Sequence, residues 1–232
     1  MSFSLSLVSK IESSNMKDFI NHCLTDVDYK KEIQRKIFHI LTISILPIAY
    51  IFFSKKQMLY VILPLSTIIV AADYYRHKID FIGKIFHFVF GHILRDKEFE
   101  ENTWTGASFV AVSALITFVI CPKIIAICAF GILAVSDCLA ALIGKGIPSK
   151  EFFEKSIAGS IAFGSSAVII LIICGLFTSQ GLAYYFFGIF AVCVTTIIEA
   201  RPSFFNLDDN LTIPLSFSIV MLFFDIVWDL NF

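Results

Sequence analysis

The sequence is poor in charged residues and lacks the composition of an ordinary soluble domain. Charged side chains make up 16% of its 232 residues, whereas about a quarter is usual in soluble globular proteins. Hydrophobic residues account for 57%, and the mean hydropathy is +0.82. One small soluble core cannot bury so many apolar side chains, so a lipid bilayer is expected to cover much of the surface. The formal net charge of -1 gives no sign of a nucleic-acid partner, and none is expected.

Several common site signatures are also missing. The six cysteines include no C-x-x-C pair, so the sequence predicts neither a zinc site nor a disulfide framework. No H-E-x-x-H stretch occurs, and the stretch GKGIPSK does not satisfy the Walker A pattern. The first 36 residues carry charges throughout and contain no long apolar core, so a cleavable signal peptide is not expected.

Apolar runs of near-spanning length fill most of the remaining sequence. Residues 1–34 form a polar segment with an amphipathic stripe, predicted to be cytosolic, and residues 35–232 form one predicted membrane domain. The predicted spans are residues 37–54, 57–72, 104–120, 124–143, 157–177, 182–198 and 211–228. The predicted fold class is therefore all-α, a polytopic membrane bundle of about seven transmembrane helices plus an interfacial helix.

The interfacial helix is predicted over residues 79–94. This segment looks apolar, but one helical stripe of it is polar or small and contains Asp80, Lys84, His87 and Gly91. Such a pattern is typical of a helix that lies flat on a membrane. With this assignment and a cytosolic N-terminus, only three of the 18 basic residues lie outside, namely Lys55, Lys56 and Lys123. If residues 79–94 span, the basic residues divide far more evenly, so the positive-inside rule favours the interfacial assignment.

This topology places every polar cluster of the sequence on the cytosolic side. The clusters are Arg35-Lys36-x-x-His39, Asp73-x-x-Arg76, Arg95-x-x-Glu98, Ser136-Asp137 with Gly144-Lys145, Lys155-Ser156-x-x-Gly159-Ser160, and Glu199 with Asp208-Asp209-Asn210. Acids and bases that converge on one face of a membrane are what a site for phosphate and a divalent cation requires.

Asp137 is the strongest single candidate for a functional residue. It lies near the end of an apolar run, in AVSDCLAALIG. An ionised group in mid-membrane costs roughly 2.5–3.5 kcal/mol on insertion scales, so such groups usually serve a function. Its carboxylate oxygens suit Mg²⁺, which prefers carboxylates together with substrate phosphates. The alternative is a carboxylate at a helix end that reaches the water of the headgroup region.

Two further stretches combine phosphate-binding and cation-binding groups. In KSIAGS, a lysine, two serines and a glycine open a helix, and helix N-termini bind phosphate through their free N–H groups. The adjacent acids of LDDNLTIP repel one another, which predicts a cation or a basic partner nearby. Plain helix caps in a solvated basic loop explain both stretches equally well. Arg35 and Lys36 can likewise be a juxtamembrane pair that holds lipid headgroups, with His39 a satisfied interfacial histidine.

Taken together and in order, these pieces resemble the CTP-dependent lipid kinases, the polyprenol kinase family that includes CTP-using diacylglycerol kinase, dolichol kinase and phytol kinase. The matching pieces are RKIFH, ADYYR, GHILRDKEF followed by TG, SDCLAALIGK, KSIAGSIAF, and IEA followed by LDDNLTIPLS, across residues 35–216. Ala158 within KSIAGS and the run DDNLTIPLS look more like the diacylglycerol kinase branch. The loop from Gly144 to Lys155 is shorter than is usual in the family.

The resemblance implies CTP as phosphoryl donor, Mg²⁺ as cofactor and a lipid alcohol as acceptor. The expected catalytic residues are Asp137, Asp209 and Lys155. The expected metal ligands are Asp137, Asp208, Asp209 and Glu199. Phosphate binding is expected from Arg35, Lys36, Gly144, Lys145, Ser156, Gly159 and Ser160. Supporting roles are expected for His39, Asp73, Arg76, Arg95, Glu98, Gly106 and Asn210.

Other functions remain open at this level. Phosphatidate cytidylyltransferase, a distant relative, also uses CTP on a lipid, but its C-terminal Asp-Arg-x-Asp pattern is absent here. A transporter or lipid-binding membrane protein also carries intramembrane acids, although no internal repeat is visible between the two halves. The expected reaction is the transfer of the γ-phosphoryl group of CTP to diacylglycerol, with dolichol and phytol as alternative acceptors.

Overall fold

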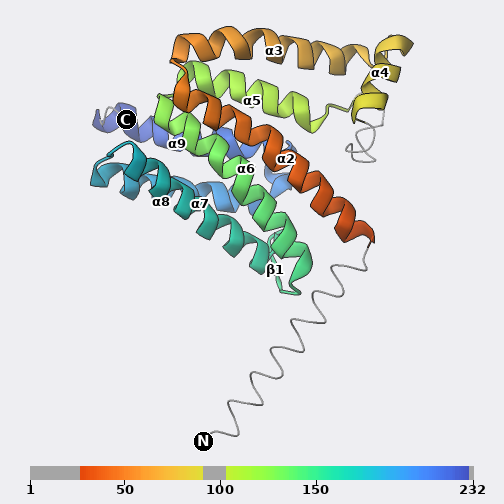
Figure 1. Ribbon diagram of the computed structural model, residues 1–232. Helices are drawn as coiled ribbons and strands as arrows, with labels where there is room; N and C mark the ends of the chain where they lie inside the picture. The colour runs from red at the N-terminus through yellow and green to blue at the C-terminus, as the bar shows by residue number, and fades with distance from the viewer. Residues whose placement is uncertain (1–26, 91–102, 230–232) are drawn as a thin grey trace, which may run out of the picture.

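A computed structural model describes residues 27–90 and 103–229, and almost all of them lie in helices (Figure 1). The helices are α2 (Val27–Phe52), α3 (Lys55–Tyr75), α4 (Asp80–Phe90), α5 (Gly106–Ile120), α6 (Lys123–Gly146), α7 (Ile157–Phe177), α8 (Leu182–Ala200) and α9 (Asp209–Trp228), with a 3-10 turn at Pro202–Phe204. Helices suit apolar runs in lipid because each backbone N–H and C=O is satisfied within the same segment. The predicted all-helical bundle is thus confirmed.

Six of these helices are long and apolar enough to cross a membrane by length and composition, which indicates a multi-pass membrane protein. They are α2, α3, α6, α7, α8 and α9. Helix α5, which corresponds to the predicted span 104–120, has only 15 residues. At 1.5 Å per residue it is about 22 Å long, shorter than a bilayer core of about 30 Å. The described part of helix α4 has 11 residues; residues 91–94 of the predicted interfacial segment lie outside the described residues, so the interfacial assignment stays a prediction.

Two local features differ from the sequence prediction. The described part of helix α2, from Val27 onward, runs without a break through the expected boundary between residues 34 and 35. A small hairpin, β1 (Glu151–Phe152) and β2 (Lys155–Ser156), occupies the loop before α7, with Phe152 opposite Lys155. Its turn places Phe153 in the left-handed region at φ 57°. The hairpin matters because it fixes the direction in which the Lys155 side chain leaves the loop.

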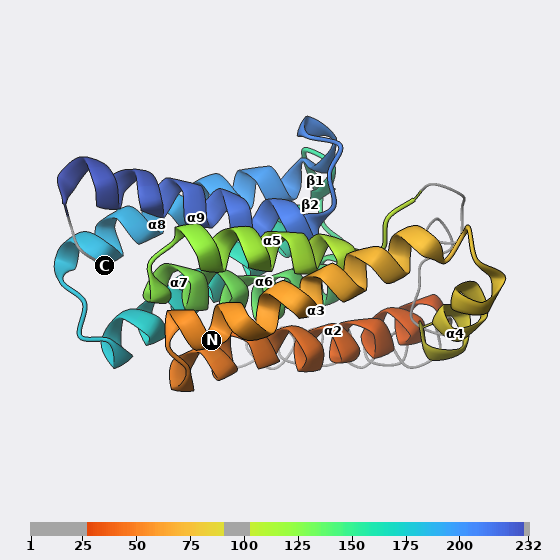
Figure 2. The same cartoon turned by 90° about the horizontal axis from the view of Figure 1, so that it is seen from above.

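Helix α6 is the central element of the bundle (Figures 1 and 2). Most of its apolar stretch is buried, and it packs against α2, α7 and α9. Its side chains form much of the core with residues from α7 and α9, including Phe163, Leu171 and Phe217. A polar side chain on α6 is therefore surrounded by protein, which explains how Asp137 can be buried in this helix.

The two ends of the bundle carry different groups. At one end, two lysines donate to carbonyl groups at helix C-termini: Lys55 to Cys121, and Lys123 to Ile51 and Phe53. At the opposite end lie the first turns of α2, α7 and α9 and the last turns of α6 and α8. All the described polar clusters of the sequence gather at this second end, as the topology prediction requires.

Helices α2 and α3 diverge from the turn that joins them. Ser54 caps α3 through a capping box with Gln57, which sets the chain direction at this turn. From there α3 packs mainly on α5, and its contacts with α2 are few. Figure 2 shows the two helices separating toward α4. This divergence leaves room between α2, α3 and α5 at the polar end of the bundle.

Candidate functional site

A buried ion pair between α2 and α6 forms the centre of the site. Lys36 Nζ lies 2.5 Å from Asp137 Oδ2, and both residues are less than a tenth exposed. His39, one turn after Lys36, places Nε2 3.5 Å from the same carboxylate oxygen and 3.4 Å from the Leu133 carbonyl oxygen. The neighbouring Cys138 thiol donates to the Lys36 carbonyl at 3.4 Å. The predicted residues Lys36, His39 and Asp137 are thus in direct contact.

A second ion-pair cluster joins the hairpin to α8 and α9. Lys155 Nζ donates to Glu199 Oε1 at 2.5 Å and to Asp209 Oδ2 at 3.0 Å. Burial alone would lower the pKa of the Lys155 ammonium, but the carboxylates of Asp209 and Glu199 outweigh it and raise the pKa above its usual value. Asp137 adds to the same effect. Three acids from three helices therefore act on one ammonium group, which stays protonated at physiological pH.

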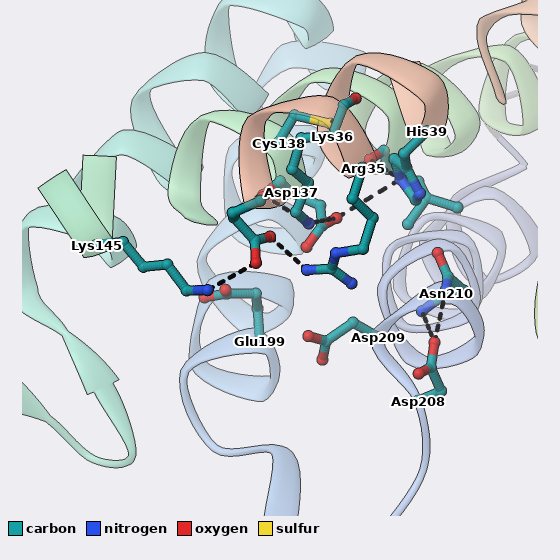
Figure 3. Close-up of polar contacts among 12 residues, drawn as sticks. Arg35, Lys36, His39, Asp137, Cys138, Lys145, Glu199, Asp208, Asp209 and Asn210 are labelled. Atoms are coloured by element: carbon teal, nitrogen blue, oxygen red, sulfur yellow. Dashed lines mark hydrogen bonds and ion pairs between the residues drawn. The ribbon is translucent and has the colours of Figure 1, made fainter. Parts of the chain in front are cut away.

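The residues present fit a divalent cation such as Mg²⁺. Among the described residues, Glu199 Oε2 and Asp209 Oδ1 are buried oxygens without a hydrogen-bond partner. An unpaired buried carboxylate oxygen is costly unless a cation or donor satisfies it. Hard oxygen ligands of this kind are the ones that Mg²⁺ prefers. Arg35, Asp137 and Asp209 point toward a common space beside these oxygens (Figure 3).

A tighter group of ligand atoms within the described part of the chain consists of His39, Asp137 and Cys138. Their ligand atoms lie within 4.8 Å of one another. The Asp137 oxygen Oδ2 already accepts from Lys36, and a thiol and an imidazole are poor ligands for Mg²⁺. This group is better described as the hydrogen-bonded support of Asp137 than as the magnesium site.

Sequence reasoning missed Glu32, which holds two of the predicted phosphate-binding residues. Its carboxylate pairs with Arg35 on the same helix, and its Oε2 lies 2.6 Å from Lys145 Nζ at the end of α6. Glu32 is only 7% exposed. The i, i+3 spacing to Arg35 is visible in the sequence, but Glu32 lies in the polar segment of residues 1–34, where nothing marks it as a site residue. The contact of Tyr29 with the Leu142 carbonyl further ties this turn to α6.

The predicted phosphate loop KSIAGS forms a helix start that is closely packed. Ser156 is the N-cap of α7 and accepts from the Gly159 N–H at 3.1 Å. Gly144 on α6 and Gly159 on α7 face each other, and a Cβ added to Gly159 would lie 3.3 Å from the Gly144 Cα atom. The two glycines thus allow a close helix crossing. The Ser160 hydroxyl is buried and has no partner among the described residues.

The predicted acidic run at the start of α9 divides into separate roles. Asp208 is the N-cap, and its Oδ1 accepts from the Asn210 backbone N–H and from Asn210 Nδ2. The Asn210 carbonyl in turn accepts from Ser113 on α5 at 2.9 Å. Asp209 alone of the three turns to Lys155. The structure therefore brings Asp209 and Glu199 together at Lys155, whereas Asp208 caps the start of α9.

A supporting polar cluster joins α3 to the start of α5. Asp73 Oδ2 accepts from the Thr105 backbone N–H at 2.8 Å and from the hydroxyls of Thr105 and Ser108. Asp73 Oδ1 pairs with Arg76 Nε at 2.8 Å, and Arg76 also donates to the Thr103 carbonyl. These contacts hold the first turn of α5, including Gly106, beside the site. Arg95 and Glu98 lie outside the described residues.

A cavity of about 510 Å³ connects the site to the apolar part of the bundle. Its polar end is formed by Arg35, Lys36, His39, Thr105, Gly106, Asp137, Asp209 and Asn210. Its remaining wall is mainly apolar and comes from α2, α3 and α5, including Ile43, Leu46, Ile62, Ile69, Val110 and Ala114. An amphiphile placed here has its polar group beside Asp137 and its chain between the helices.

Comparison with known proteins finds relatives of nearly the same length. A Rickettsia prowazekii protein described as uncharacterized protein RP860 is 34% identical over 197 residues, 84% of this chain and 94% of that protein. A Methanocaldococcus jannaschii protein, uncharacterized protein MJ1137, is 28% identical over 194 residues, 82% and 93% of the two chains. No family model matches the sequence, and no solved structure matches it. Neither description assigns an activity.

Proposed function

The chain belongs to the family of the Rickettsia prowazekii protein RP860, and from its site we propose that it is a membrane lipid kinase. The proposed reaction transfers the γ-phosphoryl group of CTP to the hydroxyl of diacylglycerol, giving phosphatidate and CDP. The observation that carries the proposal is the cavity, whose apolar wall ends at Arg35, Lys36, Asp137 and Asp209, with the Lys155–Glu199 ion pair in contact with Asp209. The choice of CTP and of diacylglycerol rests on the sequence resemblance.

The chemistry follows from which groups line the cavity. The lipid hydroxyl enters beside Asp137, which accepts its hydrogen bond and takes its proton as the oxygen bonds to the γ-phosphorus. The bond from that phosphorus to the β-γ bridging oxygen breaks, and CDP leaves with the electron pair. Catalysis of this kind is mainly positioning and charge stabilisation. Lys36 holds Asp137 in place, since its ammonium lies 2.5 Å from the carboxylate.

The triphosphate is held by the basic groups around this space. Arg35 and Lys145 lie together at Glu32, and Lys155 lies between Glu199 and Asp209. Mg²⁺ bound by Glu199 and Asp209 would neutralise phosphate charge. Because Arg35 and Lys145 already have a carboxylate partner, the phosphates must displace or share Glu32 when they bind. The cytosolic orientation of this end is part of the proposal and follows from the distribution of basic residues.

The test separates phosphoryl transfer from cytidylyl transfer and from transport. Purified protein in micelles is given Mg²⁺, diacylglycerol, and CTP labelled either at the γ or at the α phosphate. We expect label in the lipid only from the γ position. ATP is tested as an alternative donor, and dolichol and phytol are tested as alternative acceptors. Label only from the α position would indicate a cytidylyltransferase. Label from neither position, with folded protein and the full lipid panel, would contradict an enzyme of this class.

A further inference from the structure

The cavity has the depth of one leaflet of a bilayer. Along α2 it is lined from Arg35 to Leu46, and along α3 from Ala72 to Ile62. These intervals correspond to about 15–17 Å at 1.5 Å per residue. The hydrocarbon core of a bilayer is about 30 Å thick, so the cavity extends from the polar end of the bundle to about the bilayer centre.

The cavity ends where aromatic side chains fill the bundle. Tyr50 and Phe118 are fully buried, and their rings lie 4.7 Å apart, edge to face. Phe118 also stacks on Phe130 at 5.3 Å. Ala111 and Ala114 lie on α5 between Phe118 and the polar end of the helix, and their small side chains leave the cavity open. The depth of the cavity is therefore set by these two alanines and by the aromatic layer below them.

The cavity opens sideways between α2 and α3. Three of its large apolar lining residues are also exposed: Phe38 on α2 and Leu65 and Ile68 on α3. In a membrane, such exposed apolar side chains face lipid chains. The divergence of α2 from α3 seen in Figure 2 lies at the same place. A lipid can thus enter from the bilayer without its chain crossing water.

We propose that this cavity holds one hydrocarbon chain of a hydroxyl-bearing lipid, with the hydroxyl at Asp137 and the chain end at Ala114. This inference rests on the proposed function for the role of the hydroxyl. It adds that Ala111 and Ala114 limit the length of the chain that fits in the cavity. The second chain of a two-chain lipid stays in the bilayer outside α2 and α3. The chain in the cavity contacts Ile43, Leu46 and Ile62, which a lipid on the outer surface does not reach.

The test uses photo-crosslinking, which reports binding independently of turnover. The probe is a diacylglycerol with a diazirine near the end of one acyl chain, mixed with the full-length protein in nanodiscs. After irradiation, labelled peptides are mapped by mass spectrometry. We expect label at Leu46, Ile62 and Ala114. Ala111→Phe should reduce this label by at least about tenfold. The phenyl ring would exclude roughly two methylene groups of the lipid chain from the cavity, and burial of that many contributes about a tenfold change in affinity.

Val112→Phe is the matched control, because Val112 is the next residue of α5, is 37% exposed and does not line the cavity. It should leave the label at Leu46 unchanged. Thermal unfolding in detergent checks that each variant is folded. If Ala111→Phe does not fold, Ala114→Leu serves instead and should shift labelling toward probes with shorter chains.

Two outcomes separate this inference from the proposed function. Label confined to outer positions such as Ile45 and Ile172, and equal in the Phe variants, would overturn the inference even if the protein phosphorylates lipid. Label inside the cavity that is lost in Ala111→Phe would support the inference. If that result is obtained but no nucleotide donates phosphate to the lipid, the inference stands and only the kinase proposal fails.

Discussion

At the scale of single residues, the site depends on charges that are buried with partners far away in the sequence. Lys36 and Asp137 are 101 residues apart, and Lys155 and Glu199 are 44 residues apart. A buried charge without its partner is strongly destabilising, whereas an apolar pair of similar size is often tolerated. The roles of these residues in folding and in the proposed catalysis must therefore be separated by the choice of variant.

Asp137→Asn is expected to abolish phosphoryl transfer and to destabilise the fold. Asparagine has nearly the volume of aspartate, so the packing around position 137 changes little. The structure adds that Lys36, which is 5% exposed, would lose its ionised partner. Breaking such a pair costs about 3–5 kcal/mol. The measurements are thermal unfolding in detergent and turnover with γ-labelled CTP at saturating Mg²⁺.

The double variant Lys36→Met, Asp137→Leu separates the two effects. It should recover most of the stability, because no buried charge is left alone, and should remain inactive. Asp80→Asn is the control, since Asp80 is exposed on α4. Turnover in Asp137→Asn close to that of the unmodified protein would show that this carboxylate has no essential catalytic role.

Glu32 shows how a residue outside the recognised motifs shapes the site. It forms ion pairs with Arg35 and Lys145, and both are expected to bind phosphate. The charge of the proposed nucleotide site is thus lower than the motif residues alone suggest. A phosphate that enters must compete with a carboxylate that is already held in place by α2.

At the scale of elements, the crossing of α6 and α7 positions the hairpin that carries Lys155. Gly144 and Gly159 let the two backbones approach, and Ser156 accepts from Gly159 at the same place. Sequence reasoning assigned both glycines to phosphate binding. Their contacts in the structure are those of helix packing, and a role in phosphate binding stays a prediction.

Gly159→Ala is expected to lower stability and to reduce activity by moving Lys155. Its Cβ would lie 2.9 Å from the Ala140 carbonyl oxygen and 3.3 Å from the Gly144 Cα atom. Both are backbone atoms, so the helices must separate, and overpacking of this kind costs about 1–3 kcal/mol. Thermal unfolding and the apparent KM for CTP are to be measured together.

Gly181→Ala is the matched control, because a Cβ there meets nothing within 4 Å and the backbone φ of −73° suits alanine. It should leave both quantities nearly unchanged. If Gly159→Ala instead raises the KM for CTP without lowering the unfolding temperature, the glycine serves phosphate binding and the packing explanation is wrong.

At the scale of the whole molecule, the polar end and the opposite end of the bundle are expected on different sides of the membrane. Lys150 lies beside the hairpin at the polar end, and Lys55 and Lys123 lie at the other end beside the carbonyls that they cap. The excess of basic residues predicts that the polar end is cytosolic. That placement would give the site access to nucleotide.

Cysteine accessibility tests this orientation. Single cysteines are introduced at Lys56, Lys123 and Lys150, all of them exposed, and intact cells are treated with a membrane-impermeant maleimide. We expect labelling at positions 56 and 123, and labelling at position 150 only after the membrane is opened. The unmodified protein gives the background from its own six cysteines. Labelling of position 150 in intact cells would reverse the topology.

The amino-acid sequence by itself determined the helical bundle and the gathering of polar groups at one end. Apolar runs in lipid must satisfy their backbone groups internally, so helices follow from composition and length. Antiparallel neighbours then bring alternate helix ends together, which places Lys36, Asp137, Lys155 and Asp209 at one end without knowledge of their contacts. That residues 27–34 belong to α2 was harder to predict, because they are polar and continue directly into the apolar run.

Only the tertiary structure decided which of these groups pair and where a lipid chain can lie. The pairing of Glu32 with Lys145 joins residues 113 positions apart, and no local pattern encodes such a contact. The cavity likewise arises because α3 packs on α5 and diverges from α2, while Ala111 and Ala114 leave space between them. Packing of whole helices sets both features, since it depends on side chains from several segments at once.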